Sequence, residues 1–129
     1  MTTSLPGPMV TAAWLADHIA DVVVCDTRWY LDGRSARAAF DGGHIPGALH
    51  IDWREFFKED GQLKSQNLLM TLLNKHGIKQ GMEIVVYCTG GVRSAMAYFV
   101  FRKMGFKVRN YDGSWWDWSH NPALPVETS

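Results

Sequence analysis

The sequence predicts an α/β domain with a central, mainly parallel sheet. Two short runs, residues 22–25 and 84–86, are apolar at every position, which suits strands that are covered on both faces. Between such runs, stretches such as residues 66–76 carry leucines at helical spacing. Strands separated by helices imply right-handed crossovers and therefore parallel neighbours.

The first half of the chain supplies three of the expected elements. Residues 1–8, rich in Pro, Gly and Ser, are expected to be flexible, and residues 9–129 to form one domain. Thr11 can cap a helix that carries Trp14, Leu15 and Ile19. The strand at residues 22–25 ends at Asp26. A short helix over residues 35–41 is expected to stop at two glycines.

The remaining elements follow the same alternation. Residues 44–47 predict a turn, because they contain proline and glycine, and residues 48–51 a short strand. Glycines at positions 77 and 105 provide C-terminal stops for two helices. The expected elements are a helix over 66–76, a strand over 83–87, a helix from 94 to about 104, a strand over 106–111 and a turn from 112.

Composition excludes several classes of protein. Of 129 residues, 47% are hydrophobic and 20% charged, as in ordinary globular domains. Thirteen basic and thirteen acidic residues give a net charge of zero, which argues against binding nucleic acid by bulk charge. Neither a membrane span nor a signal peptide is visible, so a cytoplasmic protein is expected. The two cysteines cannot form a disulfide scaffold.

One segment carries the chemistry. Cys88 closes a buried strand and Arg93 follows it just before a helix opens at Ser94, with Thr89, Gly90, Gly91 and Val92 between. The glycines permit backbone angles that turn successive N–H groups to one side, and the helix start adds unpaired N–H groups. Such surroundings favour the thiolate over the thiol and make it a nucleophile. This requires Cys88 to be reachable from solvent, with the amides turned toward it.

The size of the loop indicates which group is transferred. Phosphatases with a cysteine nucleophile place five residues between cysteine and arginine, and here there are four. The tighter bowl suits one extra sulfur atom better than a tetrahedral phosphate. A phosphatase or arsenate reductase therefore remains the less favoured alternative.

At this point the sequence resembles the rhodanese family of sulfurtransferases over roughly residues 9–118. The loop from Cys88 to Ser94 carries the resemblance together with three markers elsewhere. The markers are Asp26-Thr27-Arg28, Gly43-His44-Ile45-Pro46-Gly47-Ala48 and Tyr111-Asp112-Gly113-Ser114-Trp115. The resemblance implies a three-layer fold with a five-stranded sheet and helices on both faces, here as a single catalytic domain.

The resemblance also implies a mechanism and its partners. Cys88 would take a sulfane sulfur from thiosulfate or 3-mercaptopyruvate as a persulfide, cradled by residues 89–94. An acceptor such as cyanide, a thiol or a protein thiol would then remove it. No metal or organic cofactor is implied, and neither a nucleic acid nor a membrane partner. A sulfur-relay or regulatory binding module is the main alternative, although regulatory members often lack the cysteine.

Departures from the family pattern leave the donor open. Thiosulfate enzymes often carry basic residues after the cysteine, where this chain has Thr89 and Gly90. Mercaptopyruvate enzymes usually end the loop with a hydroxyl residue, where this chain has Arg93. Ala39 replaces a family glutamate, so Arg28 would turn to Asp32, to Asp41 or toward substrate.

Several other residues have both an ordinary structural interpretation and a functional one. Asp26 is expected beside Cys88, either as a structural carboxylate or in tuning charge. Arg28, Arg34 and Arg37 are candidate anion contacts, and ordinary surface arginines otherwise. Cys25 is expected in the core rather than as a resolving thiol, and His44 as structural. Trp115, Trp116 and Trp118 are expected to pack on the core or over the crevice rather than to bind a partner.

Overall fold

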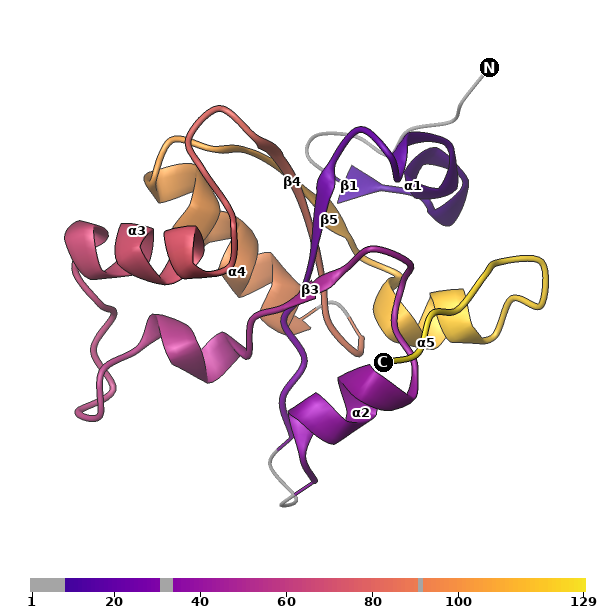
Figure 1. Ribbon diagram of the computed structural model, residues 1–129, viewed down its shortest axis with the longest axis horizontal. Coiled ribbons are helices and arrows are strands. Elements are labelled where there is room, and N and C mark those ends of the chain that lie inside the picture. Colours follow the sequence, from indigo (N-terminus) through magenta and orange to yellow (C-terminus); the bar gives the residue numbers. More distant parts are fainter. Residues whose placement is uncertain (1–8, 31–33, 91) are drawn as a thin grey trace.

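The computed structural model describes residues 9–30, 34–90 and 92–129, and it contains a five-stranded sheet whose neighbours are all parallel. The spatial order is β1-β5-β4-β2-β3, so the β2 and β4 strands lie side by side at its centre (Figure 1). The strands are β1 Met9–Val10, β2 Val23–Asp26, β3 Leu49–His50, β4 Glu83–Tyr87 and β5 Lys107–Tyr111. The expected α/β fold is confirmed.

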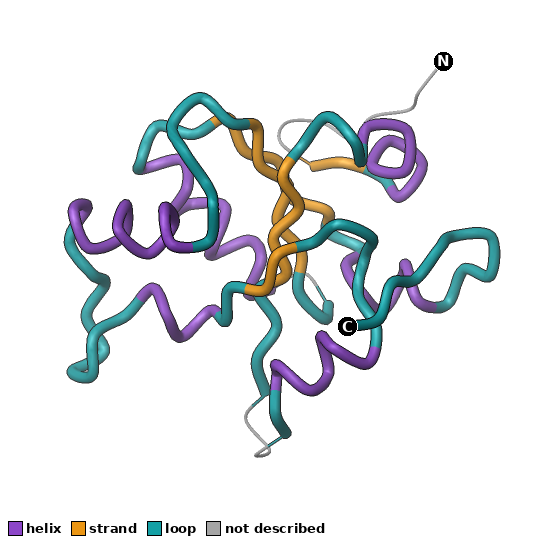
Figure 2. The backbone as a smooth tube through the Cα atoms, viewed as in Figure 1, coloured by secondary structure: helices purple, strands orange, loops and turns teal. Residues whose placement is uncertain are grey.

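Helices cover both faces of the sheet. Helices α3 and α4 lie on one face, and α1, α2 and α5 lie on the other, as Figure 2 shows with the strands in orange between them. The helices are α1 Ala12–His18, α2 Ala36–Gly42, α3 Gln66–Lys75, α4 Val92–Lys103 and α5 Ser114–Ser119, with a 3-10 turn, η1, at Trp53–Phe56. Each face has its own apolar cluster, so the molecule has three layers.

Local capping explains where several helices begin. Thr11 accepts a hydrogen bond from the N–H of Trp14, as expected of a helix cap. Ser35 and Ser65 cap α2 and α3 in the same way. Helix α4 begins at Val92, two residues before the expected position.

Three elements were missed by pattern reasoning. Strand β1 has two residues and is defined by its pairing with β5, which no periodicity can indicate. Helix α5 has no side-chain cap, and its first residue has a positive φ, so the segment has the sequence signals of a turn. The η1 turn begins after its cap Asp52, which forms a capping box with Glu55, a local pattern from which the turn could have been predicted.

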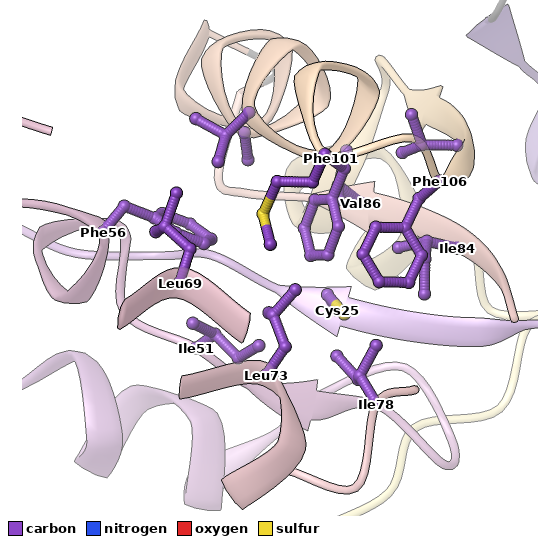
Figure 3. Close-up of a cluster of buried hydrophobic side chains, with 14 residues drawn as sticks. Cys25, Ile51, Phe56, Leu69, Leu73, Ile78, Ile84, Val86, Phe101 and Phe106 are labelled. Atoms are coloured by element: carbon purple, nitrogen blue, oxygen red, sulfur yellow. The ribbon is translucent and has the colours of Figure 1, made fainter. Parts of the chain in front are cut away.

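The larger apolar cluster lies between the sheet and helices α3 and α4. Figure 3 shows Cys25 in this cluster among Leu73, Ile78 and Ile84, with Phe101 from α4 above them. No described helix is both long and apolar enough to cross a membrane.

Two phenylalanines on α4 provide a matched test of this packing. Phe101 is completely buried, whereas Phe99 is 66% exposed. We expect Phe101→Ala to lower the free energy of unfolding by about 3–5 kcal/mol, because it leaves a cavity. Phe99→Ala should change it by less than about 0.5 kcal/mol. Urea denaturation of both variants checks this, and equal effects would contradict the placement of α4.

Candidate active site

The candidate active site lies at the carboxyl end of β4, where the strand passes into the loop before α4. Cys88 directly follows β4, and Asp26 ends the neighbouring β2 opposite Tyr87. The two reactive strand ends are therefore adjacent, as expected, at the edge where parallel sheets usually bind ligands.

The backbone around Cys88 is held by the start of α5. The N–H of Cys88 donates to Oγ of Ser114 at 3.1 Å. The N–H of Trp115 donates to the carbonyl of Cys88 at 2.9 Å, and that of Trp116 donates to the carbonyl of Thr89 at 3.0 Å. Three consecutive residues of the β5–α5 corner thus fix the beginning of the loop.

Exposure changes abruptly along the loop. Cys88 is 2% exposed, while Thr89 and Gly90 are exposed. Gly91 and the side chains of Val92 and Arg93 lie outside the described part of the chain, and Ser94 is buried in the first turn of α4. Cys88 was expected to be reachable from solvent, and its exposed fraction is lower than that expectation implies. Among the described loop residues, Thr89 and Gly90 face solvent.

Asp26 and Arg28 form a completely buried ion pair beside this loop. The Nε of Arg28 lies 2.8 Å from Oδ2 of Asp26, and its backbone N–H donates to Oδ1 at 2.9 Å. A guanidinium NH₂ also donates to the carbonyl of Gly43 at 2.8 Å. Burial by itself would lower the pKa of Arg28, but the Asp26 carboxylate raises it overall.

This pairing corrects one expectation for Arg28. Its partner is Asp26, whereas Asp41 pairs with Arg37 across one turn of α2, and Asp32 lies outside the described residues. With its charge neutralised inside the protein, Arg28 does not face a substrate. Asp26 holds Arg28 by side-chain and backbone contacts, which suits a structural carboxylate, and its role in tuning charge stays a prediction.

Two further side chains close this buried network. The hydroxyl of Tyr87 accepts from the N–H of Ile45 at 3.2 Å, and burial, followed by Asp26, raises the pKa of Tyr87 well above its ordinary value. The Trp115 ring lies against the Arg28 guanidinium, 4.8 Å from it. A Cβ added at Gly43 would lie 3.0 Å from the Trp115 ring, so the ring would have to shift by a few tenths of an ångström to make room for it.

Trp118, Trp115 and His44 have the packed placement that was expected, whereas the expectation was wrong for Trp116, which is 63% exposed. Trp118 is fully buried in the second cluster, Trp115 is half-buried and Trp116 is exposed. His44 is buried, with one ring nitrogen 2.7 Å from the carbonyl of Phe40 and the other 3.0 Å from Glu127.

Cys25 belongs to the core, as expected. It pairs in register with Val86, and Cys88 follows two residues later, so ordinary strand geometry separates the two cysteine Cα atoms by about 8 Å. A disulfide needs less than about 7 Å. Cys25 is therefore not placed to resolve Cys88 without movement of the backbone.

The buried Cys25 thiol should make stability depend on pH. Burial, followed by the charge of Asp26, raises its pKa from 9.0 to about 12. As pH rises from 9.0 toward 12, the unfolded thiol loses its proton before the folded one, so the free energy of unfolding should fall. The effect of a three-unit shift is at most about 4 kcal/mol. Denaturation of wild type and Cys25→Ala across this range should show the steeper fall in wild type, and parallel curves would contradict the assignment.

Arg34 and Arg37 are exposed, and each lies over an aromatic ring. Arg34 stacks over Tyr30 at 4.3 Å, and Arg37 lies over Phe40 at 5.2 Å. Arg37 also lines a pocket of about 620 Å³ that contains no loop residue among its described walls. The walls are Ser35, Ala36, Arg37, His50, Asp52, Arg54, Glu55 and His76.

The described side chains include no group of three His, Cys, Asp or Glu that could hold a metal ion. Ser114 and Tyr87 are site residues that sequence reasoning did not single out. Ser114 lies in the segment from Tyr111 to Trp115 that carries part of the family resemblance. Its contact with Cys88, however, joins residues 26 positions apart. Nothing local in the sequence indicates that contact.

Comparison with known proteins agrees with this architecture. Residues 11–121 match the family of the rhodanese-like domain. A thiosulfate sulfurtransferase of Azotobacter vinelandii is 33% identical over 110 residues, covering 84% of this chain and 41% of that protein. The sulfur carrier protein TtuD of Thermus thermophilus is 40% identical over 90 residues, covering 68% of this chain and 32% of that protein.

Solved structures show the same fold. SseA of Escherichia coli, described among 3-mercaptopyruvate sulfotransferases with the rhodanese fold, superposes with a TM-score of 0.86 at 25% identity. The match covers 95% of this chain and 50% of SseA. This chain thus spans half of SseA and about a third to two fifths of the two curated relatives.

Proposed function

The chain belongs to the rhodanese-like domain family, and from that premise we propose that it transfers a sulfane sulfur through a persulfide on Cys88. Relatives named as sulfurtransferases support the reaction class. The observation that carries the proposal is the position of Cys88, at the end of β4 and at the start of the loop into α4. Residues 9–129 would act as one catalytic domain.

The proposed reaction has two steps. The Cys88 thiolate attacks the outer sulfur of thiosulfate, the bond between its two sulfurs breaks, and sulfite leaves with the electron pair. An acceptor thiolate then attacks the terminal sulfur of the persulfide and restores the Cys88 thiolate. Each step exchanges one anion for another, so neither an oxidant nor a reductant is consumed. This is covalent catalysis of the ping-pong type.

The protein supplies position and electrostatic stabilisation in this proposal. The backbone clamp from α5 sets the direction in which the loop leaves β4. The amides of residues 89–94 would then face the sulfur, where hydrogen bonds to an anion are strong because little water is present. Because Cys88 is 2% exposed, only a small part of its surface is open to a donor.

The sulfur donor can be identified by comparing the two candidate donors in the same assay. The uncharged Thr89 and Gly90 resemble a mercaptopyruvate-type loop, while Arg93 after them departs from it. Sulfite release from thiosulfate and pyruvate release from 3-mercaptopyruvate should be measured side by side with a common thiol acceptor. Turnover of either donor supports the proposal. A folded, reduced protein that is inert to both donors and to other sulfane donors would overturn it.

The rival reaction has a distinct signature. Hydrolysis of an aryl phosphate without formation of a persulfide would favour a phosphatase. The four-residue spacing between Cys88 and Arg93 leads us to expect no such hydrolysis.

A further inference from the structure

We infer that Ser114 is a positioning residue for Cys88, an inference that rests on the proposed function. Ser114 lies at the first position of α5 and is completely buried. It contacts the backbone of Cys88, and its role would be to hold the nucleophile's peptide plane while sulfur is transferred.

The backbone of Ser114 is the first sign of a special role. Its φ is 57°, and among the described residues it is the only non-glycine with a positive φ. Glycine adopts this conformation at lower cost, so the serine adopts it here against its local preference. Gly113 before it has an ordinary helical conformation, and a Cβ there would lie 2.8 Å from the Cβ of Asp117, so close packing explains that glycine. What serine adds at the bend, and glycine would lack, is a hydroxyl group.

The contribution is a pair of hydrogen bonds through one oxygen. The hydroxyl of Ser114 donates to the carbonyl of Tyr111 at 2.9 Å. Because its hydrogen is used there, a lone pair of the same oxygen is left to accept from the N–H of Cys88 at 3.1 Å. The hydroxyl thus links the end of β5 to the first residue after β4.

The neighbouring amides complete a clamp. Trp115 and Trp116 donate to the carbonyls of Cys88 and Thr89, so three successive peptide planes around the nucleophile are each bonded to α5. Rotating any of these planes breaks one of the bonds. Ser114 differs from Trp115 and Trp116 because it acts through its side chain. Its hydroxyl can therefore be removed by substitution without changing the number of residues or their backbone amides.

The chemical consequence follows from burial. A thiolate or persulfide at a site that is 2% exposed depends on nearby dipoles rather than on water for stabilisation. A loop that leaves β4 in a looser direction aims those dipoles less well. Loss of Ser114 should therefore disfavour the anion and slow attack on the donor, even when the fold is intact.

The test compares Ser114→Gly and Ser114→Ala with Ser119→Ala. Glycine lacks the hydroxyl and adopts a positive φ without strain. The Ser114→Gly variant should therefore fold even if the Ser114→Ala variant, in which alanine is held at the same unfavourable φ, does not. Ser119 is an exposed serine of the same helix, and its hydroxyl contacts only α5 and His120 in the described structure. The readouts are the rate of persulfide formation with thiosulfate and the pH dependence of Cys88 alkylation by iodoacetamide.

We expect Ser114→Gly to slow persulfide formation about tenfold, the rate equivalent of one hydrogen bond. Its alkylation profile should move to higher pH, a change that a merely structural role would not produce. Ser119→Ala should match wild type. A Ser114→Gly variant with the wild-type rate and pH profile would overturn the inference. A wild-type protein that forms no persulfide would instead overturn the proposed function.

Discussion

Replacing Cys88 by serine is expected to lower kcat/KM for sulfur transfer by at least about a thousandfold. A serine hydroxyl is not ionised at neutral pH and cannot carry the sulfur as a persulfide. The oxygen is close in size to the sulfur, so the fold around this buried site should be retained. Steady-state release of sulfite or pyruvate provides the measurement.

The second cysteine provides the matched control for this variant. Cys25→Ala should retain turnover because Cys25 lies within the apolar cluster, beside Val86 of β4 rather than at the loop. Equal loss of activity in both variants would mean that the reaction depends on both thiols. Retention of turnover in Cys88→Ser would remove the basis of the proposed mechanism.

Breaking the buried ion pair should have a large effect on stability. We expect Asp26→Ala to lower the free energy of unfolding by about 3–5 kcal/mol, because the buried Arg28 guanidinium loses its carboxylate partner. The Arg28 guanidinium would then keep its hydrogen bond to the carbonyl of Gly43 but lose the carboxylate. Urea denaturation followed by circular dichroism measures the effect.

An exposed ion pair provides the control for the buried one. Asp41→Ala removes the partner of Arg37, whose side chain is 64% exposed, and should cost less than about 0.5 kcal/mol. If Asp26→Ala were as mild as Asp41→Ala, the Arg28 charge could not be sealed in the protein as described. The substrate-facing interpretation of Arg28 would then return.

Much of the fold follows from local patterns in the sequence. The apolar runs of β2 and β4 and the leucines of α3 are recognisable because burial repeats along one segment. The two-residue β1 and the uncapped α5 are defined by contacts with distant segments, so periodicity cannot reveal them. The η1 turn differs, since its capping box is local and could have been recognised.

The candidate site divides in the same way. The loop from Cys88 to Ser94 is contiguous, and its residue types alone indicate a reactive thiol. The partner of Arg28 and the contact between Ser114 and Cys88 depend on how loops meet at the sheet edge. The near-complete burial of Cys88 is also a tertiary property, which no local pattern in the sequence indicates.

Intact mass spectrometry of the protein after exposure to thiosulfate tests the persulfide most directly. We predict a gain of about 32 Da, one sulfur atom, that maps to Cys88, is reversed by a thiol acceptor and is absent from Cys88→Ser. A reduced, folded protein whose mass changes neither with thiosulfate nor with 3-mercaptopyruvate, or one that gains the sulfur on Cys25 instead, would contradict the account.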